Sequence, residues 1–188
     1  MNIIVKPYGS DLCYCRPDTT WERENKDFYS PDCVKEIGWC PILFVKISKA
    51  GKCIGKKFAT RYYDGFNFGS LLYCMTDSEN FNLAYASCAD HTSLLPSSQF
   101  DIDTLENEEN VFEVRKNGEV IFSTTGKALI ETIEDTICKA SQLTSLRIGD
   151  HIAIELNEIS RLIDRNESQA RFKAEYCGNN LFDIGVTF

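Results

Sequence analysis

The sequence has 188 residues, of which 43% are hydrophobic and 26% are charged, and its formal net charge is −8. This is the composition of a globular chain, and the length suits a single domain. The acidic balance disfavours nucleic acid and anionic membranes as partners, because phosphate binding requires a basic surface. No apolar run approaches the roughly 18 residues that a membrane span needs.

The nine cysteines are an odd number, and nothing at the start of the sequence has the form of an export signal. We therefore expect a cytoplasmic chain with free thiols, most of them buried as small hydrophobic side chains. Cys13 and Cys15 are the only close pair, and one intervening residue is too few for a usual zinc site.

Residues 1–35 are rich in proline, aspartate, serine and threonine, which predicts short strands joined by turns. The run 40–47 favours a buried strand through its β-branched and aromatic residues. Pro41 lacks a backbone donor, so it predicts a sheet edge or the first residues of that strand. Residues 56–66 are compatible with a short helix or a turn, and residues 69–75 predict another buried strand.

Residues 111–124 give the clearest local signal. Apolar residues alternate on both sides of Asn117-Gly118, a pair that accepts the positive φ angles of a type I′ turn. This pattern predicts a β-hairpin. Residues 170–188 show a similar alternation on both sides of a turn at 178–180, and they predict a second, closing hairpin.

Residues 124–146 contain the one strong helical pattern. Thr125 is a reasonable N-cap, and the apolar residues that follow share one helix face: Leu129, Ile130, Ile133, Ile137 and Ala140. A turn at Gly149-Asp150 then leads into a strand on which His151 is expected to be exposed. Many strands with one main helix indicate an α+β fold without a repeated βαβ unit.

Few residues suggest chemistry. The glycines and lysines of 48–57 lack the spacing of a phosphate-binding loop. Asp90, His91 and Ser93 are close in sequence, but catalytic groups meet in space, so a polar loop is the simpler interpretation. The predicted strands at 40–47 and 69–74 contain no Asp or Glu that could ligate a hard metal ion.

The order of several segments resembles the fumarylacetoacetate hydrolase family in its short, single-domain bacterial form. The stretches that carry the resemblance are "PDTTWERENKDFYSP", "VKISKAGKCIGKKFATRYYDG", "KNGEVIFST", "LTSLRIGDHI" and "GNNLFDI". The resemblance implies one domain over residues 1–188, mostly β, built around a rolled mixed sheet, and commonly a homodimer. It also implies a divalent cation, usually magnesium, calcium or manganese, that holds a small diketo or oxo acid.

Aligned with the family, this sequence departs from the pattern at the site. The two glutamates of the metal-binding strand fall on Cys40 and Ile42, and the ligating aspartate falls on Leu71. The resemblance further assigns former substrate or catalytic positions, and these hold Arg16, Glu79 and Gly126. The family's Thr-Gly-Thr-Pro loop is replaced by "IELN" at 154–157.

These departures favour a protein that has kept the fold and lost both the metal site and the family's catalysis. It would bind a small ligand, such as an organic acid, without a metal, or act as a structural or regulatory partner, for example of an active paralogue. The alternative is a residual or altered hydrolase, decarboxylase or isomerase acting on small oxo or diketo acids. In that case Cys40 would be the nucleophile, with Asp90 or His91 near the pocket, although Trp39 and Pro41 supply no charge to activate the thiol.

Overall fold

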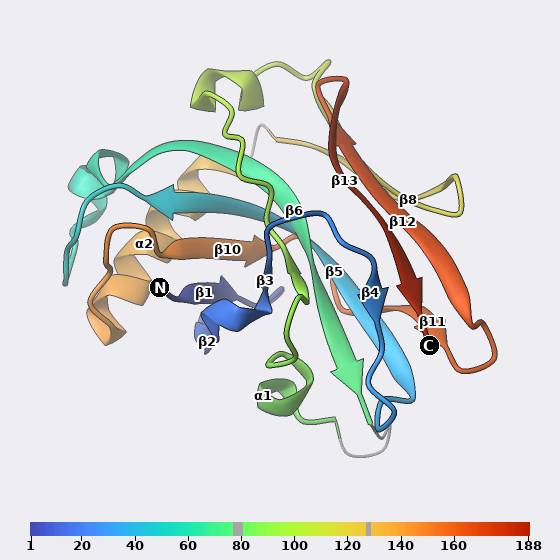
Figure 1. The fold of residues 1–188 in the computed structure, drawn as a ribbon. Coiled ribbons are helices and arrows are strands. Elements are labelled where there is room, and N and C mark those ends of the chain that lie inside the picture. The colour runs from blue at the N-terminus through green and yellow to red at the C-terminus, as the bar shows by residue number, and fades with distance from the viewer. Residues whose placement is uncertain (77–80, 127–128) are drawn as a thin grey trace.

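The computed structural model describes residues 1–76, 81–126 and 129–188, in which two β-sheets are accompanied by one long helix (Figure 1). The larger sheet holds, in spatial order, β2 (Tyr14–Arg16), β1 (Ile3–Lys6), β10 (His151–Glu155), β5 (Glu36–Ile47), β6 (Tyr63–Met75), β7 (Ser93–Leu94) and β3 (Trp21–Glu22), with β11 (Ser160–Asp164) also paired to β5. The smaller sheet holds β4 (Phe28–Tyr29), β13 (Asn179–Thr187), β12 (Gln169–Tyr176), β8 (Val111–Lys116) and β9 (Glu119–Thr125).

The helical segments are short except for one. They are α1 (Leu83–Ala86), α2 (Ile130–Leu143) and the 3₁₀ turns η1 (Asp18–Thr20), η2 (Lys56–Arg61) and η3 (Ile102–Leu105). The α+β, mostly β fold expected from the sequence is therefore confirmed. Within the described residues, no helix is long and apolar enough to cross a membrane.

The larger sheet is mixed and rolled. β1 pairs in parallel with β10, β3 pairs in parallel with β7, and the other pairings are antiparallel. Trp21 on the last strand of the sheet packs edge-on against His151 of β10, with ring centroids 4.7 Å apart. Strands that are far apart in the sheet order thus face each other, which gives the sheet an inner face that we call the roll interior.

Alternate residues of the two longest strands enter two different cores, because successive side chains of a strand point to opposite faces. Cys40, Ile42 and Phe44 of β5 point into the roll interior. Leu43 and Val45 join the core between the sheets, with Phe68 and Leu72 among their neighbours from β6, and all of these side chains are buried. The larger sheet is therefore buried on both faces at β5 and β6, and the roll interior is one of these two faces.

Pro41 lies in the middle of the twelve-residue strand β5, so the expectation that it marks an edge or a strand start is wrong. Its carbonyl accepts a hydrogen bond from Leu156 N (2.9 Å), which lies just beyond the end of β10. On this side of β5, β10 ends opposite Ile42 and β11 begins opposite Trp39. The N and C=O of one strand residue point to the same side of the strand. The nitrogen of Pro41, which has no hydrogen to donate, therefore points into the gap between β10 and β11.

The two predicted hairpins are present. β8 and β9 are joined at Asn117 (φ 52°) and Gly118 (φ 88°), both in the left-handed region that a type I′ turn requires. β12 and β13 form the closing hairpin, with Cys177 and Gly178 in the same conformation. The helix was predicted to begin after an N-cap at Thr125, but that residue ends β9 and the helix starts at Ile130.

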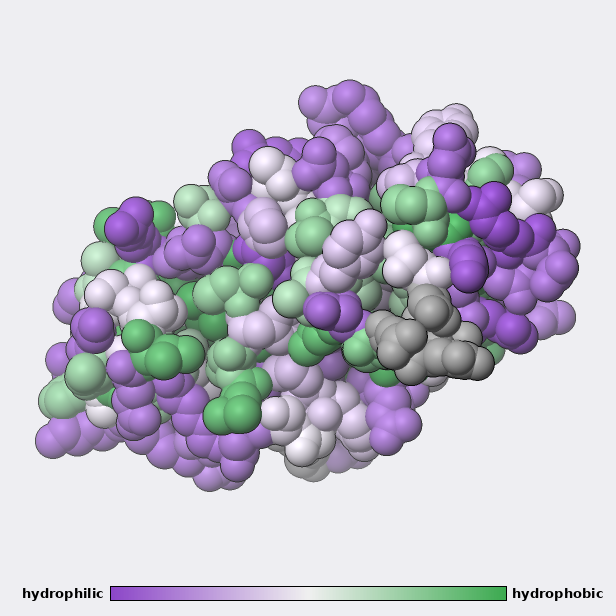
Figure 2. Space-filling view, turned by 90° about the horizontal axis from the view of Figure 1, so that it is seen from below, coloured by the Kyte–Doolittle hydropathy of each residue, from purple (hydrophilic) through white to green (hydrophobic). Residues whose placement is uncertain are grey.

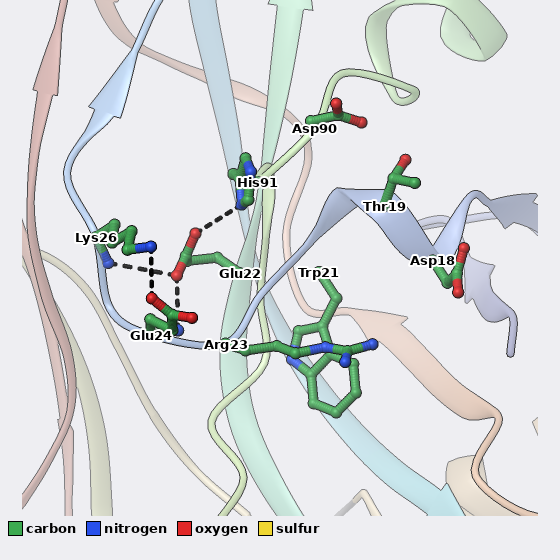
Figure 3. A pocket seen from close by; sticks show the side chains of 9 residues that line it. All are labelled: Asp18, Thr19, Trp21, Glu22, Arg23, Glu24, Lys26, Asp90 and His91. Carbon is green, nitrogen blue, oxygen red and sulfur yellow. Dashed lines mark hydrogen bonds and ion pairs between the residues drawn. The ribbon is translucent and has the colours of Figure 1, made fainter.

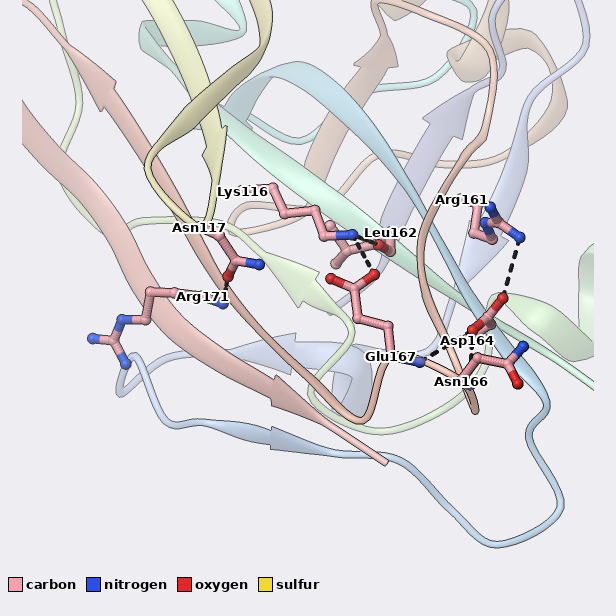
Figure 4. A network of polar contacts seen from close by, with 8 residues as sticks. All are labelled: Lys116, Asn117, Arg161, Leu162, Asp164, Asn166, Glu167 and Arg171. Carbon is pink, nitrogen blue, oxygen red and sulfur yellow. Dashed lines mark hydrogen bonds and ion pairs between the residues drawn. The ribbon is translucent and has the colours of Figure 1, made fainter.

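A polar network fastens the smaller sheet to β11 (Figure 4). Lys116 at the end of β8 donates to the carbonyl of Leu162 and to Glu167 Oε2, both at 2.6 Å. Asp164 in turn accepts from the backbone of Asn166 and Glu167 (2.8 and 3.3 Å), which shapes the turn after β11. These contacts fix the position of the smaller sheet relative to the larger sheet.

Candidate functional site

The three positions to which the resemblance assigned metal ligands lie together in the roll interior. Cys40 and Leu71 are direct partners in the β5–β6 ladder, and Ile42 is two residues further along the same face. All three side chains are fully buried. They pack in one cluster with other buried apolar or aromatic side chains, namely Ile3, Val5, Phe44, Tyr73, Ala86, Leu95 and Ala153.

The chemistry of these donors does not fit magnesium, calcium or manganese. Ile42 and Leu71 carry no donor atom, and hard dications require several oxygen ligands. The Cys40 thiol is itself a donor, to the carbonyl of Asn157 at 2.9 Å. In the described parts of the chain, no group of three or more His, Cys, Asp or Glu side chains is arranged to hold a metal ion.

The environment of Cys40 also opposes nucleophilic chemistry. Burial raises the pKa of the thiol well above its usual range, and the nearby Glu155 carboxyl raises it further. A reactive cysteine needs the opposite conditions, because the thiolate is the nucleophile. Cys40 is therefore held as a neutral thiol whose hydrogen bond ties β5 to the segment that connects β10 and β11. The expectation that most cysteines are buried is wrong, because only Cys40 and Cys74 are, and five are exposed: Cys15, Cys33, Cys53, Cys88 and Cys177.

The roll interior also contains a carboxylate whose burial no sequence pattern predicts. Glu155 lies at the end of β10, opposite Ile42 of β5, and is buried. The Tyr73 hydroxyl donates to its Oε1 in a short hydrogen bond, and the backbone N of Tyr8 donates to Oε2 at 3.0 Å. The Tyr14 hydroxyl lies 2.9 Å from that of Tyr73 and extends the network. Burial raises the pKa of Glu155, while the Tyr73 hydrogen bond opposes this shift.

His151 and Arg16 line the same interior. His151 was expected to be exposed, but it is buried on the inner face of β10, since Trp21 and Phe44 cover its ring. Burial lowers the pKa of His151 to about 4, so its imidazole is neutral at physiological pH. Arg16 is buried on β2 and stacks over the Tyr73 ring, 5.1 Å from guanidinium carbon to centroid.

The acceptors of Arg16 among the described residues are all neutral. Its Nε donates to the Ser87 carbonyl (2.8 Å), and one Nη2 donates to the Leu72 carbonyl (2.7 Å) and to Thr92 Oγ1 (3.0 Å). Neither Arg16 Nη1 nor His151 Nδ1 has a hydrogen-bond partner among the described residues. Because the three acceptors are uncharged, these bonds join β2 to β6 and to the loop before β7 without neutralising the guanidinium charge. The unpaired Nη1 leaves one buried donor unsatisfied, which is costly.

The other two predicted positions do not join this group. Gly126 directly follows β9 of the smaller sheet and is covered by Leu105, whose Cδ2 would be 2.2 Å from an added Cβ. Its glycine is therefore explained by close packing. Glu79 lies outside the described residues.

A second site lies on the outside of the roll, where β3 and β7 end the sheet (Figure 3). It is an open pocket of about 440 Å³ lined by residues of the segments 18–26 and 90–91: Asp18, Thr19, Trp21, Glu22, Arg23, Glu24, Lys26, Asp90 and His91. Here Asp90 and His91, named as pocket residues in the alternative hypothesis, do line a cavity. Cys40 is not among the lining residues.

Glu22 is the centre of this pocket. Its side chain is only 4% exposed, and its Oε2 lies 2.8 Å from His91 Nδ1, whose ring is 61% exposed. Its Oε1 accepts from the backbone N of Glu24 (2.7 Å) and of Lys26 (3.3 Å). His91 has a φ angle of 60°, a conformation that costs energy for a residue other than glycine. The backbone N of His91 donates to the Thr19 carbonyl at 3.2 Å, which joins the two segments.

Nothing in the sequence indicates that Glu22 and His91 are neighbours, because they are far apart along the chain. The parallel pairing of β3 with β7 sets Trp21 opposite Ser93 and Glu22 opposite Leu94. A two-residue strand has no periodicity that a sequence could show. An Asp-His pair beside a turn was the only available signal.

Comparisons with known proteins establish the fold. No family model matches the chain, and no curated protein sequence matches it. Among solved structures, maleylpyruvate hydrolase from Sphingobium sp. SYK-6 is similar over 99% of this chain and 70% of its own, with a TM-score of 0.76 and 14% identity. The 5-carboxymethyl-2-hydroxymuconate delta-isomerase from Mycobacterium smegmatis is similar over 99% of this chain and 77% of its own (TM-score 0.74, 14% identity).

A Yersinia pestis CO92 protein provisionally assigned to the fumarylacetoacetate hydrolase family is similar over 99% of this chain and 91% of its own (TM-score 0.73, 14% identity). The Sphingobium hydrolase has also been solved with manganese(II) and pyruvate bound. At these identities the likeness concerns the fold alone. The chain has the rolled-sheet fold found in hydrolases and isomerases of the fumarylacetoacetate hydrolase type.

Proposed function

We propose that this chain binds a small ligand without a metal and does not carry out metal-dependent oxo-acid chemistry in its roll interior. The observation that carries the proposal is the replacement of the expected oxygen donors by Cys40, Ile42 and Leu71, all fully buried in a packed cluster. A dication placed there would have to give up its hydration for one thiol and two hydrocarbon groups, which is prohibitively costly.

The hydrogen-bonded groups around Glu155 support the same proposal. Tyr73, Tyr14 and Glu155 satisfy one another, and Cys40 bonds to the connection after β10. Such a network is what a polar core needs in order to be stable. Glu155 is a single carboxylate, and it is already occupied by two donors.

A second candidate function is an altered hydrolase or isomerase for small oxo acids. The similarity of the fold to a maleylpyruvate hydrolase and to a muconate delta-isomerase favours it. Such activity would need either another metal site or a metal-free mechanism. The second of these would involve the outer pocket, where His91 is oriented by Glu22 in the manner of a general base and its partner.

The two candidates are separated by metal binding and turnover. Calorimetric titration of the purified chain with Mn²⁺ or Mg²⁺ is expected to give no saturable binding, and hydrolysis of acylpyruvates, followed by ultraviolet absorbance, is expected to equal the buffer rate. A metal-dependent rate that exceeds the buffer rate would refute the first proposal. A rate that persists with a chelator and is lost in His91→Gln would support the metal-free form of the second.

A structural or regulatory role, in a homodimer or with an active paralogue, is a further proposal. Two of the most exposed apolar side chains, Leu12 (80%) and Leu143 (78%), line one groove of about 440 Å³ beside α2. Apolar and polar residues are intermingled on the face seen in Figure 2, so that view offers no broad apolar surface of the kind an obligate partner covers. Light scattering of the purified chain tests the homodimer directly.

A further inference from the structure

We propose that the outer pocket around Glu22 and His91 binds a small diamino acid, a molecule with two ammonium groups and one carboxylate. The inference rests on the proposed function, since it names the site and the ligand class of the same metal-free binding protein. It is carried by the charges of the pocket and by the way the buried Glu22 carboxylate organises them.

The pocket is held in shape without a ligand. Glu22 binds His91 on one carboxylate oxygen and two backbone N–H groups of the loop 23–26 on the other. The Thr20 hydroxyl lies 2.8 Å from that of Ser93, which fastens the start of β3 to β7. Preorganisation of this kind lowers the entropy that a ligand has to lose on binding. The volume of about 440 Å³ is in the range of small-molecule sites.

Two of the charged pairs in the pocket are internally satisfied. Glu22 and His91 form one pair at 2.8 Å, and Lys26 and Glu24 form the other at 2.5 Å. These pairs shape the wall and leave little demand for an outside partner. The pocket therefore has one side whose charged groups are paired with each other and another side whose charged groups are unpaired.

Three charged side chains of the pocket have no ion pair or side-chain hydrogen bond among the described residues: Asp18, Asp90 and Arg23. The Arg23 guanidinium carbon lies 4.3 Å from the centroid of the Trp21 ring, and Arg23 is otherwise exposed, so its N–H groups are accessible. An accessible guanidinium suits a carboxylate, which it can bind through two parallel hydrogen bonds.

The unpaired groups of the pocket are thus two carboxylates and one guanidinium. A ligand that complements them carries two positive groups and one negative group. A carboxylate complements Arg23, and two ammonium groups complement Asp18 and Asp90. A diamino acid such as ornithine or lysine carries this set, and its methylene chain suits the apolar edge of Trp21. His91 Nε2, which has no partner in the described part of the chain, adds one directed hydrogen bond.

The proposal is tested by calorimetric titration with L-ornithine and L-lysine as probes. Butylamine and acetate, which carry one charged group each, are the ligand controls, and pyruvate represents the oxo acids. We expect each diamino acid to bind at least about tenfold more tightly than either single-charge control, since two further charged contacts are made. Binding of acetate or pyruvate as tight as that of ornithine would overturn the ligand class.

The location is tested with charge-neutralising variants of exposed residues, which are not expected to alter folding. Asp90→Asn and Arg23→Met are each expected to weaken ornithine binding about tenfold. Asp64→Asn and Arg147→Met, exposed residues outside the pocket, are the matched controls and are expected to bind as the unmodified chain does. If all four variants bound ornithine equally well, the proposal that ornithine binds in the outer pocket would be wrong.

The absence of any heat with either diamino acid would also overturn the inference. That result would leave the proposed function standing on its metal and turnover measurements. Conversely, saturable Mn²⁺ binding with hydrolysis of an acylpyruvate would overturn the proposed function, while the response of ornithine binding to Asp90→Asn and Arg23→Met would still decide the site.

Discussion

Removing the Tyr73 hydroxyl tests whether the roll interior is a coupled polar core. In Tyr73→Phe, Glu155 loses the donor at Oε1 and the Tyr14 hydroxyl loses its neighbour, while the aromatic packing is kept. A hydrogen bond to an ionised buried group contributes about 1.5–3 kcal/mol, and one between neutral groups contributes about 0.5–1.5 kcal/mol. We therefore expect a loss of unfolding free energy of about 1.5–3 kcal/mol when Glu155 is ionised.

The loss of unfolding free energy in Tyr73→Phe depends on pH. The folded-state pKa of Glu155 is raised above its ordinary value of 4.5, so ionising it destabilises the fold as pH rises from about 4.5 through the folded pKa. The Tyr73 hydrogen bond lowers this pKa, so its removal raises the pKa further and extends the loss of stability to higher pH. The penalty of the variant should be near the neutral-bond value, about 1 kcal/mol, at pH 4.5 and larger at pH 8.

Urea unfolding at a series of pH values, followed by tryptophan fluorescence, measures the effect. Tyr176→Phe is the matched control, because its buried hydroxyl donates to the neutral carbonyl of Thr104 at 3.1 Å. That variant should lose about 1 kcal/mol at every pH. A penalty for Tyr73→Phe that does not change with pH, or that is no larger than the control's at pH 8, would show that Glu155 is not held by this network.

Three further outcomes follow from the packing. Gly126→Ala is expected to lower the unfolding free energy by about 1–3 kcal/mol through overpacking, because its added Cβ would meet a buried leucine at 2.2 Å; Gly55→Ala, whose nearest neighbour would be 3.9 Å away, should not, and equal stability of both would contradict the close packing. Cys40 is expected to react with an aqueous thiol reagent, read by mass spectrometry, only after unfolding, since burial raises its pKa; labelling at the rate of the exposed cysteines would show that the roll is open. The His151 imidazole is expected to titrate near pH 4 by NMR, so the stability it contributes is lost as pH falls from 6.5 towards 4; titration near 6.5 would place its ring in water.

The sequence predicted those parts of the fold in which local signals agree with the tertiary structure. Phe112 and Val114 alternate with polar residues, Asn117-Gly118 accepts positive φ, and the hairpin of β8 and β9 is present as expected. The helix was also predicted, but its start was not. Thr125 could cap a helix, yet its pairing with Val111 extends β9 instead.

The site was harder to predict because it depends on contacts between distant segments. Glu155 alternates with His151 on β10, and a half-exposed strand would have placed both side chains in water. The rolling of the sheet buries this face, and no local pattern reports it. Likewise Glu22 belongs to a polar loop by composition, and only the parallel pairing of β3 with β7 makes it a buried carboxylate beside His91.

Trp21 links the two sites and explains how one can be closed while the other is open. Its indole N–H donates to the Leu95 carbonyl at 2.8 Å, which fixes the ring between the roll interior and the outer pocket. One side of the ring system meets His151, and Arg23 lies over it towards the pocket. A ligand in the outer pocket is therefore separated from Cys40 by an aromatic wall. If the ligand binds in the outer pocket, as proposed, the roll interior does not have to admit it and can be packed as a core that supports the pocket.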